Sequence, residues 1–495
     1  MFQSMKKHLS LILLACMVLS LFVGFGIDQA SAAPAAKAAA KAPAVSQAPK
    51  YVFYFIGDGL GASQRQITEY FLREKYGNKN LKLLMNQLPV SGINTTYAAD
   101  TLVTDSAAAG TALATGHKTN NGVISLLPNG KKVKTLMEAA KEKGMATGLV
   151  STTRLTHATP AVFATHHPDR DDENPMAEQY VAAGVDYLAA GGYRHFIAKD
   201  STLGKSKRTD SRDLVGEMKA KGYKAFITEE DSEKFREYKP KANDKVLGLF
   251  TASHLPYEID RINRKSKTPS LAELTEKGIE LLAKNPKGFF MMVEGGRIDH
   301  ACHANDAPGA IYDTIAFDQA LSKAYEFYKK HPRETLIVVV GDHETGGLGL
   351  GLGDNYFLTL KELMGAKVSV EDNLNGKGAY TKGTNRAEYF QYLEENLGLK
   401  KMTAEEKAEI TKAMDLIDKD TKSDKRRYGG YNQVSIAATH VLSERANIFW
   451  TTYAHSGTAI PMSAIGVGAE NFGGYKDNTE IAKAMAKLMN FQLTK

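Results

Sequence analysis

The sequence contains very little cysteine. Only Cys16 and Cys302 occur among its 495 residues. Cys16 lies in an N-terminal apolar segment that we expect to be removed, so the mature chain keeps Cys302 alone and can form no internal disulfide. Such a chain must be stabilised by its hydrophobic core and by any ions that it binds.

The sequence also lacks a strong excess of charge. Its net charge is +7, but residues 1–50 hold five lysines against one aspartate, which leaves +3 for residues 51–495. This balance argues against a basic nucleic-acid-binding surface. The content of 43% hydrophobic and 24% charged residues is that of a globular protein and excludes disordered, collagen-like and coiled-coil classes.

Long hydrophobic runs are missing after the N-terminus. The apolar run Leu9–Ile27 follows two lysines and precedes Ala30-Ser31-Ala32, which is typical of a cleaved signal peptide covering residues 1–32. A membrane anchor is the alternative. A lipoprotein site at Cys16 fits less well, because apolar residues continue beyond it. We expect residues 33–50 to be an Ala/Pro/Lys-rich linker, and the protein to be exported to the periplasm, cell envelope or extracellular space.

Short apolar runs alternate with helical patterns along the chain. The runs are rich in Val, Ile and Phe, as in strands buried on both faces, and they predict a doubly wound, mostly parallel α/β sheet in which ligands bind beyond the carboxyl ends of the strands. The predicted strands are Tyr51–Ile56, Ala146–Val150, Phe289–Val293 and Leu336–Val340. The predicted helices include Val133–Lys143, Ser270–Ala283 and Ala310–Lys329.

Two stretches depart from this alternation. Residues from about 350 to 441 are rich in Gly, Asn, Lys, Asp and Tyr, and predict an inserted subdomain with a helix over Thr403–Leu416. Residues 169–267 are more charged and predict a second elaboration. We find no internal repeat.

Polar residues follow several of the predicted strands. Asp58 lies between two glycines after the first strand, where a solvated turn is the alternative reading. Ser106 follows Asp105 at a predicted helix start, which favours an anion, although a simple N-cap is the alternative. Asp105 could hold a divalent ion beside this hydroxyl and so activate it.

Other candidates lie farther along the chain. Arg170 offers a planar fork for phosphate oxygens, with a surface ion pair as the alternative. Asp299 and His303 are four residues apart and face the same way on a helix, a spacing suited to Zn²⁺. Asp342-His343 and His455 follow in further strand-end turns. So many buried acids would be costly unless cations neutralise them.

Taken in order, these clusters resemble the alkaline phosphatases over most of residues 51–495. The motifs that carry the resemblance are Ile56-Gly57-Asp58-Gly59, Thr104-Asp105-Ser106-Ala107-Ala108, Ala158-Thr159-Pro160, Val293-Glu294-Gly295 with Ile298-Asp299, Asp342-His343, and His455-Ser456-Gly457.

The resemblance implies a role for each matching residue. Ser106 matches the nucleophile that becomes phosphoserine, and Arg170 matches the arginine that clamps the phosphate. One Zn²⁺ would be bound by Asp299, His303 and His455, and a second by Asp58, Asp105, Asp342 and His343. A Mg²⁺ would be bound by Asp58, Thr159 and Glu294. The implied fold is a three-layer α/β/α sandwich with a crown-like insertion at a homodimer interface.

Two histidines depart from the best-known bacterial pattern. His157 replaces an aspartate near the magnesium ion and His300 replaces a lysine near the phosphate. Because imidazole suits zinc or cobalt better than magnesium, the third site could hold Zn²⁺ or Co²⁺ instead.

The expected activity is hydrolysis of small phosphate monoesters of broad specificity, with no nucleic acid as a specific partner. A phosphodiesterase of the same superfamily is the alternative. A sulfatase is disfavoured, because Ser106 is followed by alanines and lacks the Cys-x-Pro-x-Arg-like context. A secreted metal- or phosphate-binding protein without turnover is the rival from another class.

Overall fold

The computed structural model describes residues 48–493, and the predicted signal peptide and most of the linker lie outside this range. Its centre is a ten-stranded sheet in the order β14-β2-β13-β8-β1-β7-β3-β4-β6-β5. Neighbouring strands are parallel except around β13, which runs antiparallel to β2 and β8. The strands are β1 (Tyr51–Gly57), β2 (Val90–Asn94), β3 (Ala146–Arg154), β4 (Tyr187–Gly191), β5 (Tyr223–Ile227), β6 (Lys245–Leu249), β7 (Phe289–Gly295), β8 (Thr335–Gly341), β13 (Ile460–Gly466) and β14 (Gly474–Lys476).

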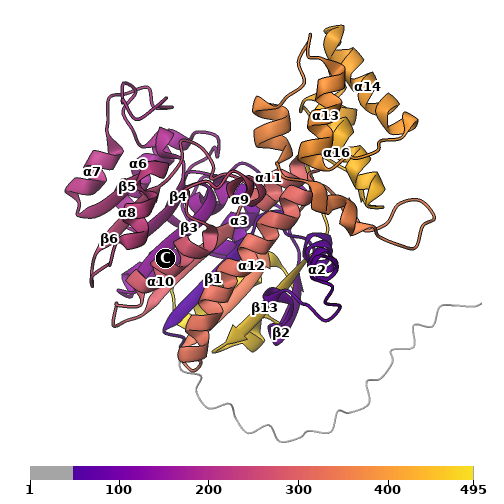
Figure 1. Ribbon diagram of the computed structural model, residues 1–495. Coiled ribbons are helices and arrows are strands. Elements are labelled where there is room, and N and C mark those ends of the chain that lie inside the picture. The colour runs from indigo at the N-terminus through magenta and orange to yellow at the C-terminus, as the bar shows by residue number, and fades with distance from the viewer. Residues whose placement is uncertain (1–47, 494–495) are drawn as a thin grey trace, which may run out of the picture. The chain divides into compact units, whose positions relative to one another are not determined.

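Helices cover both faces of this sheet. Along β1, Phe53 and Phe55 point into one core, whereas Tyr54 and Ile56 point into the other, as the two-residue period of a strand requires. The first core lies under α2 (Ala62–Tyr76), α10 (Leu271–Leu282) and α12 (Ala307–Lys330), and Figure 1 shows α10 and α12 in front of the strands. The second core lies under α3 (Ser106–Thr115), α4 (Leu136–Glu142), α5 (Ala158–Ala164), α6 (Glu173–Ala183), α7 (Leu214–Ala220) and α17 (Asn478–Met489). The predicted α/β/α sandwich is confirmed.

The elements predicted from the sequence occur close to their expected bounds. Each of the four predicted strands extends one to four residues farther than its apolar run, because residues flanking the run still pair with the neighbouring strands. Thr135 and Ser270 cap α4 and α10 in reciprocal capping boxes with Glu138 and Glu273, which explains where these helices begin.

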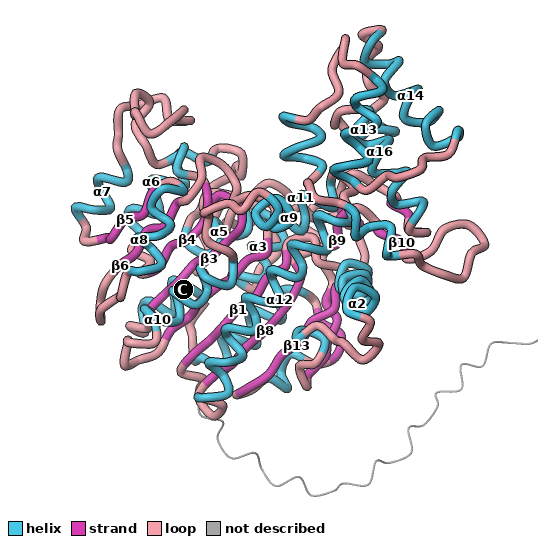
Figure 2. Tube along the Cα trace, viewed as in Figure 1, coloured by secondary structure: helices cyan, strands magenta, loops and turns pink. Residues whose placement is uncertain are grey.

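The stretch 169–267 contributes more to the sheet than the sequence indicated. It holds β4, β5 and β6, which form one edge of the sheet (Figure 2). These strands have five residues each, too few for their periodicity to distinguish them from loop. The short helices α8 (Ser232–Glu237) and α9 (Glu258–Asn263) accompany them.

Residues 350–441 add no strand to the sheet in the part of the chain that the structure describes. They form short 3₁₀ and π turns over Leu360–Gly365 and Val370–Lys377, followed by α13 (Arg386–Leu397), α14 (Ala404–Asp418), α15 (Lys425–Tyr428) and α16, which ends at Arg445. The helix predicted over Thr403–Leu416 corresponds to α14, which Thr403 caps. We call residues 350–441 the inserted region.

No helix within residues 48–493 is both long enough and apolar enough to cross a bilayer. Cys302 is a buried free thiol. Other elements include α11 (Arg297–His303), α16 (Gln433–Arg445), β9 (Glu344–Thr345), β10 (Leu348–Gly349), β11 (Phe449–Trp450) and β12 (His455–Ser456).

Candidate metal and phosphate site

Three strands of the sheet end in register. Gly57 of β1 pairs with both Gly295 of β7 and Gly341 of β8, so the residues at these strand ends lie side by side. The register brings together the carboxylates of Asp58, Glu294 and Asp342, which are all 0% exposed. The sequence alone predicted a ligand site at this edge of the sheet.

Backbone packing around Asp58 requires glycine. Gly59 has φ = 71°, and a Cβ atom there would lie 2.9 Å from the Cα of Asp299. Its backbone N–H donates to Oδ1 of Asp342 at 3.2 Å. The Gly-Asp-Gly sequence therefore forms a buried turn that joins two of the predicted ligand segments, and not a solvated one.

Asp58, Asp342 and His343 form the first of three groups whose potential ligand atoms lie within 4.8 Å of one another. Nε2 of His343 lies 3.3 Å from Oδ1 of Asp58 and 3.4 Å from Oδ2 of Asp342. Both of these carboxylate oxygens are buried and have no hydrogen-bond partner. Orphaned buried oxygens beside an imidazole fit a divalent cation such as zinc.

Asp299, His303 and His455 form the second group. The helix α11 places Asp299 and His303 one turn apart, and the pairing of β12 with β9 brings His455 to them. Nδ1 of His303 lies 2.6 Å from the backbone oxygen of Tyr453, and Nδ1 of His455 lies 2.7 Å from that of Thr104. These contacts leave both Nε2 atoms facing Oδ1 of Asp299, an orientation suited to metal binding.

Asp58, His157 and Glu294 form the third group, so Asp58 belongs to two groups. Oγ1 of Thr159 donates to Oδ2 of Asp58 at 3.2 Å. Oε1 of Glu294 and Nδ1 of His157 are buried without hydrogen-bond partners, as expected of atoms that can take an ion.

The third group has two further neighbours that the sequence analysis missed. Thr153 donates to Oε2 of Glu294 at 3.1 Å, and Ser151 donates to the same oxygen. Both lie at the end of β3, just past the apolar run that identified this strand. A run of hydroxyl residues directly after a predicted strand is the signal that could have identified them.

The buried carboxylates of the three groups repel one another. Burial, together with the carboxylates of Asp342, Asp299 and Glu294, raises the pKa of Asp58 well above its ordinary range. Burial raises the pKa of Glu294 to about 7, and burial with the nearby Asp299 raises that of Asp342 to about 8. Bound cations would remove this electrostatic cost, and the mixture of carboxylate oxygens and imidazole nitrogens fits zinc in the first two groups.

Ser106 is the first residue of α3. Its Oγ lies 3.0 Å from Nε2 of His343, and its side chain is almost fully buried. Asp105 caps the helix by accepting from the backbone N–H of Ala108 at 2.9 Å. The hydroxyl thus lies at the positive end of a ten-residue helix, next to the first group.

Arg170 pairs with Asp105, 65 residues away, and not with the aspartates beside it in sequence. Its Nη1 lies 2.9 Å from Oδ2 of Asp105, and its Nη2 lies 3.2 Å from Nε2 of His157. The same Asp105 oxygen accepts from the backbone N–H of Gly122 at 2.9 Å. Asp105 is in none of the three groups. Both oxygens of Asp105 accept hydrogen bonds from nearby donors, and its assignment to the second Zn²⁺ stays a prediction.

His300 lies near the third group but not in it. Its ring centroid is 5.4 Å from that of His157 and 4.4 Å from that of His254. Burial lowers the pKa of His300 to about 4, so the ring is neutral at neutral pH. His254 was not identified from the sequence, since it lies in a loop after β6 without a neighbouring motif.

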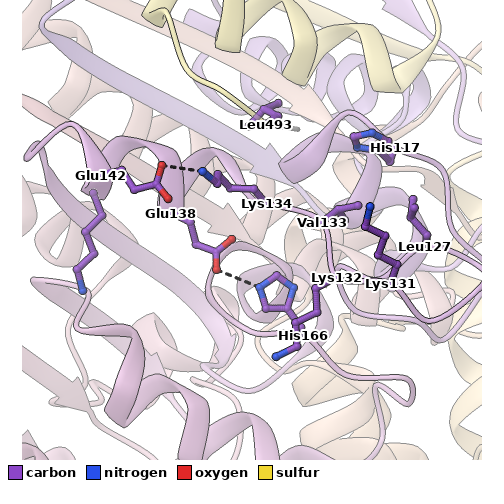
Figure 3. Close-up of a pocket in the computed structure, with 11 residues that line it drawn as sticks. His117, Leu127, Lys131, Lys132, Val133, Lys134, Glu138, Glu142, His166 and Leu493 are labelled. Atoms are coloured by element: carbon purple, nitrogen blue, oxygen red, sulfur yellow. Dashed lines mark hydrogen bonds and ion pairs between the residues drawn. The ribbon is translucent and has the colours of Figure 1, made fainter. Parts of the chain in front are cut away.

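A cavity of about 620 Å³ lies elsewhere, against α4. It is lined by His117, His166, four lysines and two glutamates, and its acids are already paired, Glu138 with His166 and Glu142 with Lys134 (Figure 3). None of the predicted site residues lines it. The catalytic candidates therefore remain at the strand ends.

Comparisons with known proteins indicate the family of the chain. The family model described as alkaline phosphatase matches residues 49–491. Alkaline phosphatase 3 of Bacillus subtilis (strain 168) is 34% identical over 479 residues, which are 95% of this chain and 96% of that protein.

Solved structures are similar as well. The alkaline phosphatase of Thermus thermophilus superposes with a TM-score of 0.78 at 29% identity, covering 91% of this chain and 93% of that one. A variant of the TAB5 alkaline phosphatase in which a histidine is replaced by aspartate, with Mg bound in its M3 site, superposes with a TM-score of 0.61 at 25% identity, covering 90% of this chain and 99% of that one.

Proposed function

The chain belongs to the alkaline phosphatase family of metal-dependent phosphate monoester hydrolases, and from this premise we propose that it hydrolyses a broad range of monoesters through a phosphoserine at Ser106. One observation carries the proposal. The Ser106 hydroxyl lies at the N-terminus of α3 and 3.0 Å from His343, which belongs to a group with orphaned carboxylate oxygens.

Ser106, Arg170 and Asp105 have different roles in the proposed phosphoryl transfer. Oγ of Ser106 attacks phosphorus, the ester P–O bond breaks and the alcohol leaves, and water then releases inorganic phosphate from the serine. The fork of Arg170 binds two of the non-reacting oxygens, and Asp105 holds that fork in place. Because these contacts grip only the phosphoryl group, the alcohol is left unselected.

The three groups would hold the cations. We propose two Zn²⁺ ions, one bound by Asp58, Asp342 and His343 and one by Asp299, His303 and His455. When bound, divalent cations supply Lewis-acid stabilisation of the negative charge that develops on the reacting oxygens and lower the pKa of the serine hydroxyl. Asp105 is retained here as the residue that holds Arg170.

The third ion would be bound by Asp58, His157 and Glu294, with Thr159 beside them. Mg²⁺ is the ion that the family resemblance implies, whereas the imidazole of His157 favours Zn²⁺ or Co²⁺. The TAB5 variant supports this distinction, because replacing a histidine with aspartate in that protein accompanies Mg in its M3 site.

We also propose that the protein is exported and dimeric. Export is supported by the signal-peptide pattern of residues 1–32, which lie outside the described residues. The inserted region adds helices and no strand of the main sheet, as expected of a crown-like element. The family resemblance places such an element at a dimer interface, and this supports the proposed dimer.

The function is tested with purified protein reconstituted with Zn²⁺ and Mg²⁺. Rates on 4-nitrophenyl phosphate and bis(4-nitrophenyl) phosphate are compared at pH 8 to 10. We expect turnover of the monoester to exceed that of the diester by orders of magnitude. Faster diester hydrolysis would establish the phosphodiesterase alternative, and zinc binding without turnover of either substrate would establish a binding protein.

A further inference from the structure

Arg297 is a buried cation at the start of α11. Its side chain is 2% exposed, yet its partners lie on another part of the chain, in the inserted region. Nη2 of Arg297 donates to Oδ2 of Asp372 at 2.6 Å, and Nη1 donates to Oε2 of Glu371 at 3.2 Å. These are the only ion pairs between α11 and the inserted region within the described residues.

The guanidinium of Arg297 also packs against the ring of Tyr257. Its Cζ lies 3.6 Å from the ring centroid of Tyr257, and the hydroxyl of Tyr257 donates to the same Glu371 oxygen at 2.5 Å. Nη1 of Arg297 further contacts Nδ1 of His300 at 3.2 Å. Tyr257 and the acids Glu371 and Asp372 therefore contact the guanidinium from two segments that lie far from Arg297 in the sequence. Together these contacts fix the position of the planar group.

The helix that Arg297 begins is short. It has seven residues, too few to hold an orientation by its own hydrogen bonds, and it carries both Asp299 and His303. A buried arginine without its acids is strongly unfavourable, so α11 is stable in this position only while Glu371 and Asp372 face it.

A second anchor lies at the other end of the helix. Asn305 has φ = 50°, and its backbone oxygen accepts from Thr439 of α16 at 2.9 Å. Its side-chain Oδ1 lies 3.0 Å from Nε2 of His440, and its Nδ2 donates to the backbone oxygen of Thr452 at 3.1 Å. The inserted region thus contacts the residues on both sides of the Asp299–His303 turn.

We propose that Arg297 is a positioning residue through which Glu371 and Asp372 of the inserted region hold α11, and with it Asp299 and His303, in the orientation that binds a metal ion. The inference rests on the proposed function, because it takes Asp299, His303 and His455 as the ligands. It gives the inserted region a role within its own subunit, separate from the role in a dimer.

The test replaces the two acids while keeping their shape. Glu371→Gln combined with Asp372→Asn leaves hydrogen-bond acceptors but removes the charges that face Arg297. The matched control is Asp415→Asn with Asp418→Asn, because these acids pair with Arg386, each at 2.6 Å, entirely within the inserted region. Zn²⁺ affinity of the metal-free protein is measured by competition with a chromophoric chelator, alongside kcat, KM and thermal unfolding.

In the Glu371/Asp372 variant, we expect the Zn²⁺ bound by Asp299, His303 and His455 to be held about 10- to 100-fold less tightly. A loss of this size is typical when groups that orient metal ligands are removed. The kcat of this variant should fall at limiting Zn²⁺ and recover at saturating Zn²⁺, and the control variant should match wild type. Arg297→Lys, which keeps the charge but loses the fork, should fall between the two.

Unchanged Zn²⁺ affinity in the Glu371/Asp372 variant overturns the inference, and so does an equal loss in the control variant, since that would show a general effect of destabilising the inserted region. His303→Ala separates the inference from the proposed function. If His303→Ala keeps full Zn²⁺ affinity, the ligand set itself is wrong; if it loses Zn²⁺ while the Glu371/Asp372 variant does not, only the positioning role fails.

Discussion

Oγ of Ser106 lies 3.0 Å from Nε2 of His343, although 237 residues separate them in the sequence. One residue begins α3 and the other follows β8, so the contact joins a helix N-terminus to the carboxyl end of a central strand. This juxtaposition places the candidate nucleophile beside the group formed by Asp58, Asp342 and His343, and it leads to the first prediction.

Ser106→Ala should lower kcat on 4-nitrophenyl phosphate by roughly 10³-fold or more, because it removes the attacking oxygen. Mass spectrometry of wild type, mixed with substrate and quenched at low pH, should show one phosphate on the peptide that contains Ser106. Ser435→Ala is a suitable control, since Ser435 is also buried and donates to the backbone oxygen of Leu374 outside the site. A Ser106→Ala enzyme with wild-type rate would remove the nucleophile from the mechanism.

Arg170→Ala should weaken inhibition by inorganic phosphate by about 10- to 100-fold, since charge-assisted hydrogen bonds contribute about 1.5 to 3 kcal/mol. Arg170→Lys keeps the charge without the fork and should lose part of this affinity. Inhibition constants at fixed pH and ionic strength provide the measurement. Equal inhibition of wild type and Arg170→Ala would contradict the clamp.

Asp105→Asn separates two roles for that residue. If Asp105 holds Arg170, as its 2.9 Å contact indicates, the variant should keep its zinc content and bind phosphate more weakly. Metal analysis of the purified variant, with phosphate inhibition measured in parallel, tests this. Loss of one zinc per chain would instead support the ligand role inferred from the sequence.

His157→Asp should shift the third site toward magnesium, because a carboxylate oxygen replaces an imidazole nitrogen beside Asp58 and Glu294. The variant should show stronger activation by Mg²⁺ than wild type, and its third ion should be identifiable by elemental analysis. His117→Asp, in the separate cavity of Figure 3, should leave the metal preference unchanged. Identical metal content and Mg²⁺ response in wild type and His157→Asp would contradict this role.

Removal of metal should destabilise the protein. Chelation leaves Asp58, Glu294 and Asp342 to repel one another, whereas cations at 100-fold excess over their dissociation constant contribute roughly 3 kcal/mol per site to folding. Thermal unfolding of chelated, Zn²⁺-reloaded and untreated protein checks this. A chelated protein that unfolds at the same temperature as the reloaded one would indicate that these acids do not bind cations.

His195 should contribute a loss of stability at acid pH. Burial lowers its pKa from 6.5 to about 4 despite the carboxylate of Glu173, 3.3 Å away. The unfolded chain therefore binds the proton more readily than the folded one, so stability falls as pH drops from about 6.5 to about 4. Between pH 7 and pH 5 this group alone should cost about 2 kcal/mol.

His195→Gln should flatten that part of the stability profile. The free energy of unfolding, measured in urea at pH 7 and pH 5, should change less with pH in this variant than in wild type. His331→Gln, which alters a partly exposed histidine, serves as the control. If wild type and His195→Gln lose equal stability between these pH values, another group carries the acid sensitivity.

The sequence predicted those features that depend on neighbouring residues. Apolar runs located the strands, and the helix predicted over Thr403–Leu416 corresponds to α14. The four-residue spacing of Asp299 and His303 predicted that both face the same way, because the geometry of one helical turn requires it. Family motifs then extended these local patterns to a function.

Contacts between distant segments could not be predicted in this way. Sequence reasoning did not indicate that Asp105 contacts Arg170 across 65 residues of sequence. It also did not identify β4, β5 and β6 as strands of the sheet. Likewise, no local pattern indicates that Arg297 meets Glu371 and Asp372.

The chain by itself therefore determined which chemical groups are present and which of them share a helix or a strand end, since backbone periodicity acts over a few residues. Only the tertiary structure decided that Arg170 meets Asp105 and that the inserted region faces α11. The reason is physical: those arrangements depend on strand register and on the desolvation of charges whose partners come from distant parts of the chain.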